Sequence, residues 1–296
     1  MDDLIKFIAI LVAMLIGHPI VAWLSCELRQ LRREALNKKI EEKKYLSVKD
    51  ALSLEAGIDI ASNSAFGGST SVYLRGAPSG NTLVLMDGIR LYDPISTDAS
   101  YDLANLMLDN VERIEIIKGL QSSLFGSDAI GGVINIITRQ GKGKPNFTFS
   151  SEGASKRTFT ESLGASGSAD KFYYSAEASR QDSHGFSKAR DGAESDSYQN
   201  NNFSGKFSYR PDENLELGVK SSYVRAKIDL DDGAYADDVD FWTKYENVLL
   251  TLFTEQRIND NWSHNLDYSW LRNVRKYTDD SDQSWDTYKA RGQEAN

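Results

Sequence analysis

The sequence of 296 residues is poor in the side chains that metal centres and disulfide frameworks need. Its one cysteine, Cys26, excludes a disulfide framework and any zinc site built from several cysteines. The three histidines, at positions 18, 184 and 264, lie far apart in the chain, which argues against a histidine-rich metal centre. The sequence also shows no nucleophile–base pair and no phosphate-binding loop, so we predict that the protein is not an enzyme.

Positive charge is scarce as well. The chain has 34 lysines and arginines against 43 aspartates and glutamates, which gives a formal net charge of −9. A nucleic-acid-binding protein needs a basic surface to neutralise phosphates, so no nucleic-acid partner is expected. With 22 glycines, only five prolines and 26% charged residues, the composition excludes collagen and does not favour disorder. The length suggests about two domains of roughly 100–200 residues each.

Residues 1–44 differ in composition from the rest of the chain. An apolar stretch over residues 4–24 is followed by a charged run over residues 27–44. About 20 apolar residues can cross a bilayer as a helix, and the basic residues that follow would hold that side in the cytoplasm. A secretory signal would begin with basic residues, whereas this chain begins with Asp2 and Asp3. Three interpretations stay open: a membrane anchor, a degenerate signal, or a wrongly assigned start or fusion.

Residues 45–142 have the pattern of a compact α/β segment with glycine at its turns. A short helix is expected first, and each later apolar run ends in a turn sequence such as Asp87-Gly88. The pattern predicts a helix over 48–55 and strands over 71–75, 82–86, 111–118 and 132–138. Taken alone, this pattern indicates a small soluble domain and no particular function.

Residues 143–296 consist of alternating segments separated by polar loops. In one of them Phe172, Tyr174, Ala176 and Ala178 share a face, opposite a polar face. The segments reach ten or more residues, carry aromatics near their ends, and are joined by alternately short and long connections, which favours an outer-membrane β-barrel. A soluble β-sandwich also alternates and remains the second interpretation.

Two stretches carry a specific resemblance. The sequences TLVLMDGIRLYDP (82–94) and VERIEIIKGLQSSLFGSDAIGGVINIITRQG (111–141), together with Arg75-Gly76, resemble the plug domain of TonB-dependent outer-membrane receptors. The resemblance covers roughly residues 46–141, and the strand pattern that follows is similar to the start of the family's barrel. One departure is Leu120, where the family usually has proline.

The resemblance implies an α+β plug domain followed by an incomplete antiparallel transmembrane β-barrel, with about 7–8 of the family's 22 strands. The expected organisation is an atypical hydrophobic and charged segment over 1–44, the plug over 45–142, and the N-terminal part of the barrel over 143–296. The chain is therefore expected to be a fragment. A non-transporting truncated plug and partial barrel, or a membrane-anchored binding module, is the alternative.

The function implied by the resemblance is uptake of a scarce large nutrient, cobalamin or a ferric siderophore, across the outer membrane of a Gram-negative cell. The start of the barrel is most similar to the cobalamin-receptor type. The implied partners are outer-membrane lipid and the TonB-type energy-transducing complex of the inner membrane, and no cofactor is required. An enzyme with a soluble β domain is the least favoured reading.

The resemblance also assigns roles to plug residues. Arg75 and Arg113 are carried over as the plug arginines that, in the family, pair with barrel carboxylates and lock the plug; two solvated surface arginines are the alternative. Plug loops contact ligand in the family, and aromatic and polar groups on a concave surface suit a large ligand. The expected substrate-binding residues are Phe66, Tyr92, Asp93 and Tyr101.

Two acidic loops suggest a possible calcium site. In the cobalamin receptor, acidic residues of the corresponding loops bind calcium, which takes about six to eight oxygen ligands. The candidate ligands here are Asp191, Glu194, Asp196, Asp229 and Asp231. Their spacing is not that of an EF-hand, and the alternative is a pair of solvated acidic loops.

Overall fold

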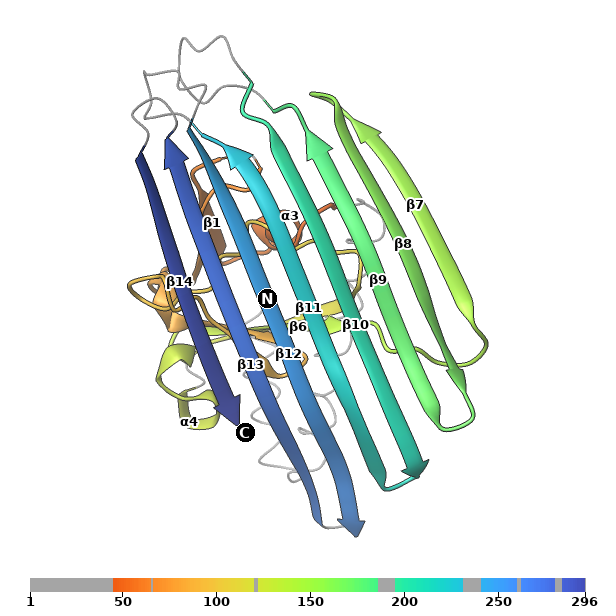
Figure 1. Ribbon diagram of the computed structural model, residues 1–296. Helices are drawn as coiled ribbons and strands as arrows, with labels where there is room; N and C mark the ends of the chain where they lie inside the picture. Colours follow the sequence, from red (N-terminus) through yellow and green to blue (C-terminus); the bar gives the residue numbers. More distant parts are fainter. Residues whose placement is uncertain are drawn as a thin grey trace, which may run out of the picture.

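The computed structural model describes residues 45–64, 66–119, 122–185, 195–230, 241–259, 262–279 and 284–295. These residues form a small plug that lies against one face of a tall, curved eight-stranded sheet (Figure 1). The expected anchor or signal in residues 1–44 lies outside the described residues. Within the described parts of the chain, no helix combines the length and the apolar character needed to cross a bilayer.

The plug begins with the short helix α3 (Val48–Ser53) and the hairpin of β1 (Ile58–Ser62) and β2 (Thr70–Leu74). Ser47 caps the helix, because its hydroxyl accepts a hydrogen bond from the Asp50 amide at 3.3 Å. The predicted helix is confirmed, but it ends two residues earlier than expected. Strand β1 was not predicted from the sequence.

A four-stranded sheet with the order β4-β3-β6-β5 completes the plug. Its strands are β3 (Thr82–Met86), β4 (Ile89–Leu91), β5 (Val111–Lys118) and β6 (Gly132–Thr138), with the short helix α4 (Ser122–Phe125) between β5 and β6. Asp87 and Gly88 form the β3–β4 turn with φ of 50° and 83°, and such turns need positive φ. The Asp87 carboxylate accepts from the Thr138 amide at 2.8 Å, which ties this turn to the end of β6.

Gly132, at the start of β6, has no room for a side chain. Its φ is +143°, and an added Cβ would overlap the Ile117 carbonyl oxygen and the Leu74 side chain. We expect Gly132→Ala to lower the free energy of unfolding by about 2–4 kcal/mol, through backbone strain and overpacking. Gly153→Ala is the matched control, because a Cβ there meets nothing within 4 Å. Urea unfolding of the two variants measures the difference, and equal stabilities would contradict this account of Gly132.

The second part of the fold is an antiparallel sheet in which each strand pairs with the next along the chain. Its strands are β7 (Asn146–Ala154), β8 (Thr158–Ala169), β9 (Phe172–Ser183), β10 (Tyr198–Asp212), β11 (Leu215–Asp229), β12 (Phe241–Asn259), β13 (Trp262–Asp279) and β14 (Ser284–Ala295). Tight turns join β8 to β9 and β10 to β11 at the lower end in Figure 1. The predicted fold class, a plug followed by part of an antiparallel barrel, is confirmed.

The two faces of this sheet have inverted polarity. In β9 the face toward the plug buries Ser175, Glu177 and Ser179, while Phe172 and Ala178 on the other face are exposed. A soluble β-sandwich buries its apolar face instead, so the sandwich interpretation is wrong. Large exposed apolar side chains on the outward face include Phe147, Phe149, Leu163, Leu250, Leu252, Leu266 and Trp285.

The apolar core lies in the plug and extends to the barrel. Leu52 of α3, Leu74 of β2 and Ile134 of β6 are fully buried within it. Leu249 of β12 and Leu271 of β13, which pair with each other, join the same cluster from the inner face of the sheet. The plug is therefore packed onto the sheet by apolar burial as well as by polar contacts.

Candidate functional site at the plug–barrel interface

The plug segment between β4 and β5, residues 92–110, runs along the inner face of the barrel strands. The Tyr198 hydroxyl of β10 donates to Asn105 Oδ1 at 3.0 Å, and Asn200 Nδ2 donates to the Asn105 carbonyl oxygen, also at 3.0 Å. Three strands further along the sheet, Asn273 Nδ2 of β13 donates to the carbonyl oxygen of Tyr92 at 3.3 Å. Barrel side chains thus hold both ends of this segment.

A buried ion-pair cluster lies at the centre of this interface. Arg275 Nη2 of β13 lies 2.9 Å from Asp93 Oδ2 and 3.5 Å from Asp102 Oδ2. Asp93 is only 1% exposed, so its charge depends on this one arginine and on nearby hydrogen-bond donors. One barrel cation therefore joins two plug carboxylates that lie nine residues apart in the same loop. We call Asp93, Asp102 and Arg275 the latch.

The plug backbone positions both latch carboxylates. Asp93 Oδ1 accepts from the amide of Ile95 at 3.0 Å, and Asp102 Oδ1 accepts from the amides of Thr70 and Ala104, each at 3.0 Å. Burial raises the pKa of Asp102, while these amide bonds and Arg275 oppose the rise. The remaining oxygen of each carboxylate is left to face Arg275. Backbone amides of the plug thus fix the orientation of both carboxylates toward Arg275.

Aromatic rings surround the latch. Tyr101 is buried beside Asp102, and burial raises the pKa of its phenol well above the usual range. The Arg275 guanidinium lies 5.7 Å from the ring centre of Tyr245 on β12, within the range of a cation–π contact. These rings keep water from the ion pairs, which strengthens them.

The structure brings together most of the residues expected to bind substrate. Asp93 and Tyr101 lie in the latch region, and Tyr92 is half-buried with the Arg90 guanidinium 5.4 Å from its ring centre. Phe66 stands apart from them and stacks on Tyr198, with ring centres 5.8 Å apart and planes 16° apart. In this structure these groups contact the barrel, and their role in substrate binding stays a prediction.

The two plug arginines carried over from the resemblance lie elsewhere. Arg113 pairs with Glu112 at 2.9 Å and with Glu115 at 3.0 Å, both on its own strand β5. Arg75 is exposed at a positive φ of 56° and makes no ion pair with the residues that the structure describes. Pairing of these two arginines with barrel carboxylates stays a prediction. The latch has the opposite arrangement, in which the arginine belongs to the barrel and the carboxylates belong to the plug.

Most of the expected calcium ligands, namely Asp191, Glu194 and Asp231, lie outside the described residues. Of the other two, Asp196 is buried, and Asp229 accepts from the Ser197 hydroxyl and pairs with Lys227 at 3.1 Å. No three histidine, cysteine, aspartate or glutamate side chains gather as a metal site among the residues described. Calcium binding stays a prediction.

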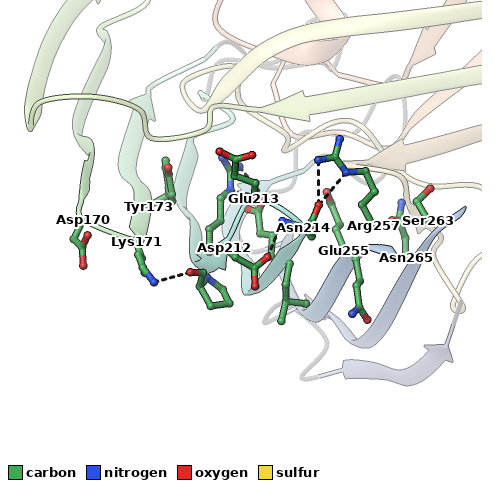
Figure 2. Close-up of a pocket in the computed structure, with 15 residues that line it drawn as sticks. Asp170, Lys171, Tyr173, Asp212, Glu213, Asn214, Glu255, Arg257, Ser263 and Asn265 are labelled. Atoms are coloured by element: carbon green, nitrogen blue, oxygen red, sulfur yellow. Dashed lines mark hydrogen bonds and ion pairs between the residues drawn. The ribbon is translucent and has the colours of Figure 1, made fainter. Parts of the chain in front are cut away.

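Two cavities adjoin the strands of the large sheet. At the end with the tight turns, a cavity of about 580 Å³ is lined by charged and polar residues, where Arg257 bonds Asn214 Oδ1 at 3.1 Å and Lys171 bonds the Pro211 carbonyl at 2.6 Å (Figure 2). A second cavity of about 520 Å³ lies between the plug and strands β7–β9. Neither cavity is lined by the residues expected to bind substrate.

Sequence reasoning missed the barrel half of the latch. Arg275 and Asn273 lie on the inner face of β13 with Ser269 and Leu271, whereas Arg272 and Lys276 lie on the outer face. The available signal was this alternation, which places a cation on a face that would meet the plug. The alternation does not tell which plug carboxylate the cation meets.

Residues 35–133 match the family model described as TonB-dependent Receptor Plug Domain. This range includes α3, β1–β5 and the Asp93 and Asp102 carboxylates. The match agrees with the architecture of a small mixed plug held inside a curved sheet with a polar inner face. Over these residues the chain is thus similar to the plug domain of TonB-dependent receptors.

Solved structures with the same fold include the ferric enterobactin receptor of Pseudomonas aeruginosa, with a TM-score of 0.68 and 18% identity over 88% of this chain and 45% of that one. The ferric yersiniabactin uptake receptor of Yersinia pestis has a TM-score of 0.66 and 20% identity, over 84% of this chain and 42% of that one. The siderophore receptor PiuA of Acinetobacter baumannii has a TM-score of 0.64 and 17% identity, over 79% and 35%. The chain thus spans less than half the length of these proteins.

Proposed function

We propose that the chain belongs to a TonB-dependent receptor of the Gram-negative outer membrane that takes up an iron chelate such as a ferric siderophore. The observation that carries the proposal is the plug held against a sheet whose inner face is polar and whose outer face is apolar. A sheet of this polarity suits a bilayer outside and a hydrated lumen inside. In a receptor of this kind, the inner-membrane energy-transducing complex acts on the plug and the substrate passes inward.

Aromatic side chains at both ends of the outward face support the membrane location. Trp242 and Trp285 lie in one register row at the loop end, on either side of Thr278. Phe172 and Tyr209 pair at the tight-turn end, with ring centres 4.8 Å apart. Aromatic girdles at both interfaces are a feature of transmembrane barrels.

We prefer an iron chelate over cobalamin because the similar structures include receptors for ferric enterobactin and ferric yersiniabactin and a transporter for ferric citrate. Cobalamin was expected because the start of the barrel is most similar to the cobalamin-receptor type, and none of these matches supports it. The segment of residues 92–110, which we call the latch loop, carries Tyr92 and Tyr101, and aromatic rings of this kind suit the large planar groups of many iron chelates.

A binding experiment tests the substrate. The full chain, folded in detergent micelles, is titrated separately with ferric enterobactin, ferric yersiniabactin, ferric citrate and cobalamin while tryptophan fluorescence is recorded. We expect saturable quenching by at least one ferric chelate and none by cobalamin. Circular dichroism on the same sample verifies the β-structure. A folded chain that binds cobalamin alone would overturn the iron assignment, and one that binds no ligand would favour the non-transporting alternative.

A further inference from the structure

Three lysines stand side by side on the outward face of the sheet. In the strand register Lys227 of β11 lies opposite Lys244 of β12, which lies opposite Lys276 of β13. We call these three residues the lysine row. Like charges directly opposite each other destabilise a sheet, so the fold gains nothing from this arrangement.

The three ammonium groups are concentrated around one ring. The Nζ atoms of Lys227, Lys244 and Lys276 lie 5.6, 4.5 and 5.3 Å from the ring centre of Trp242. Lys227 pairs with Asp229, but Lys244 and Lys276 make no ion pair with any residue that the structure describes. In a chain with a net charge of −9, this small area therefore carries an uncompensated positive charge.

The position of the lysine row matches one edge of a bilayer. On β11 the outward-facing Leu217 precedes Lys227 by ten residues, a rise of about 34 Å at roughly 3.4 Å per residue. With a strand tilt of about 40°, this rise spans about 26 Å along the membrane normal, close to the roughly 25 Å apolar band of such barrels. The lysines thus lie at the level of lipid head groups, on the side of the long loops.

We propose that the lysine row binds the phosphate groups of an anionic lipid in the leaflet next to the long loops. Phosphate oxygens accept hydrogen bonds from several ammonium groups at once and offset their mutual repulsion. Trp242, one outward-facing row nearer the long loops, holds its ring close to all three ammonium groups and provides an apolar surface beside the lipid head group. One outward-facing row closer to the middle of the sheet, Glu246 already pairs with Arg272 at 3.3 Å. The positive charge that is left to bind a phosphate is therefore that of the lysine row. The site rests on the proposed membrane location but not on the identity of the transported nutrient.

Lipid binding to the full chain in neutral detergent micelles tests the site. The probe is a diphosphoryl glucosamine glycolipid (diphosphoryl lipid A), compared with the same glycolipid after phosphate removal, and native mass spectrometry counts the bound lipid. We expect Lys244→Gln with Lys276→Gln to weaken binding of the phosphorylated lipid by about tenfold or more, since each basic group near a membrane surface contributes about 1 kcal/mol. Binding of the dephosphorylated lipid is expected to be weak in every variant.

The matched control is Lys142→Gln with Lys144→Gln, which removes the same charge from exposed positions between β6 and β7. This control is expected to bind the lipid as the unchanged chain does. Equal loss in both double variants, or equal binding of the two lipids by the unchanged chain, would overturn the proposal. Titration of the same samples with ferric enterobactin separates the two ideas: lipid binding without chelate binding would sustain the lysine row while the proposed substrate fails.

Discussion

Replacing Arg275 with methionine is expected to weaken docking of the plug loop onto the barrel by about 3–5 kcal/mol. The substitution removes the one barrel cation within ion-pair distance of Asp93 and Asp102 among the described residues. Asp93 would then be a buried charge without a partner, which is far more costly than an exposed one. Hydrogen exchange of the amides in residues 92–106, in the full chain folded in micelles, is the measurement.

Arg272→Met is the matched control on the same strand. Arg272 lies on the opposite face of β13 and pairs with Glu246 at the outer surface, so its loss removes a charge without touching the plug. We expect no change in exchange across the latch loop in this variant. If both variants opened the loop equally, general weakening of β13 would explain the effect and the latch would not.

The latch also predicts a double-variant result and a dependence on pH. Asp93→Asn should be much less damaging in the Arg275→Met background than alone, because the two changes act on one ion pair.

The pKa of Asp102 in the folded chain is already raised by burial. A carboxyl group whose pKa is higher in the folded than in the unfolded chain favours folding at a pH below the unfolded pKa and costs stability at a higher pH. The Arg275→Met defect should therefore shrink as the pH is lowered from about 7.5 to about 5.

Much of the plug could be predicted because its strands are decided locally. The apolar runs over Thr82–Met86, Val111–Lys118 and Gly132–Thr138 became β3, β5 and β6 with the expected bounds. Strand β4 was missed, since three residues after a tight turn give too short a pattern to detect. Strand β1 (Ile58–Ser62) was missed because its alternation is weak and its pairing with β2 decides it.

The candidate site could be predicted only on its plug side. Tyr92, Asp93 and Tyr101 were found through their place in a loop of the resembling domain, and they do lie together. Their partner Arg275 lies 182 residues from Asp93 in the sequence, and the contact depends on which strand of the sheet faces the loop. Strand order and register are properties of the whole sheet, which alternation within one strand does not specify.

Replacing Leu250 with arginine is expected to lower the stability of the chain in lipid vesicles by about 2–4 kcal/mol. Leu250 is 41% exposed on the outward face of β12, midway along the strand between Lys244 and Gln256. If the lysine row marks one membrane interface and Gln256 lies near the other, Leu250 lies at the bilayer midplane, where a guanidinium loses most of its hydration. Urea titration of vesicle-folded protein, followed by tryptophan fluorescence, measures the loss.

A comparison of two positions at different depths in the bilayer makes this prediction specific to a membrane. Gln256→Arg places the same charge on the same face of the same strand, six residues closer to the tight turn, and should cost no more than about 1 kcal/mol. In neutral detergent without a bilayer, the gap between the two variants should narrow, because a micelle adapts to a single charge more readily. Equal stabilities of the two variants in vesicles would mean that the outward face does not contact a hydrocarbon core. The apolar exposure of β7–β14 would then have to be covered by protein instead of lipid.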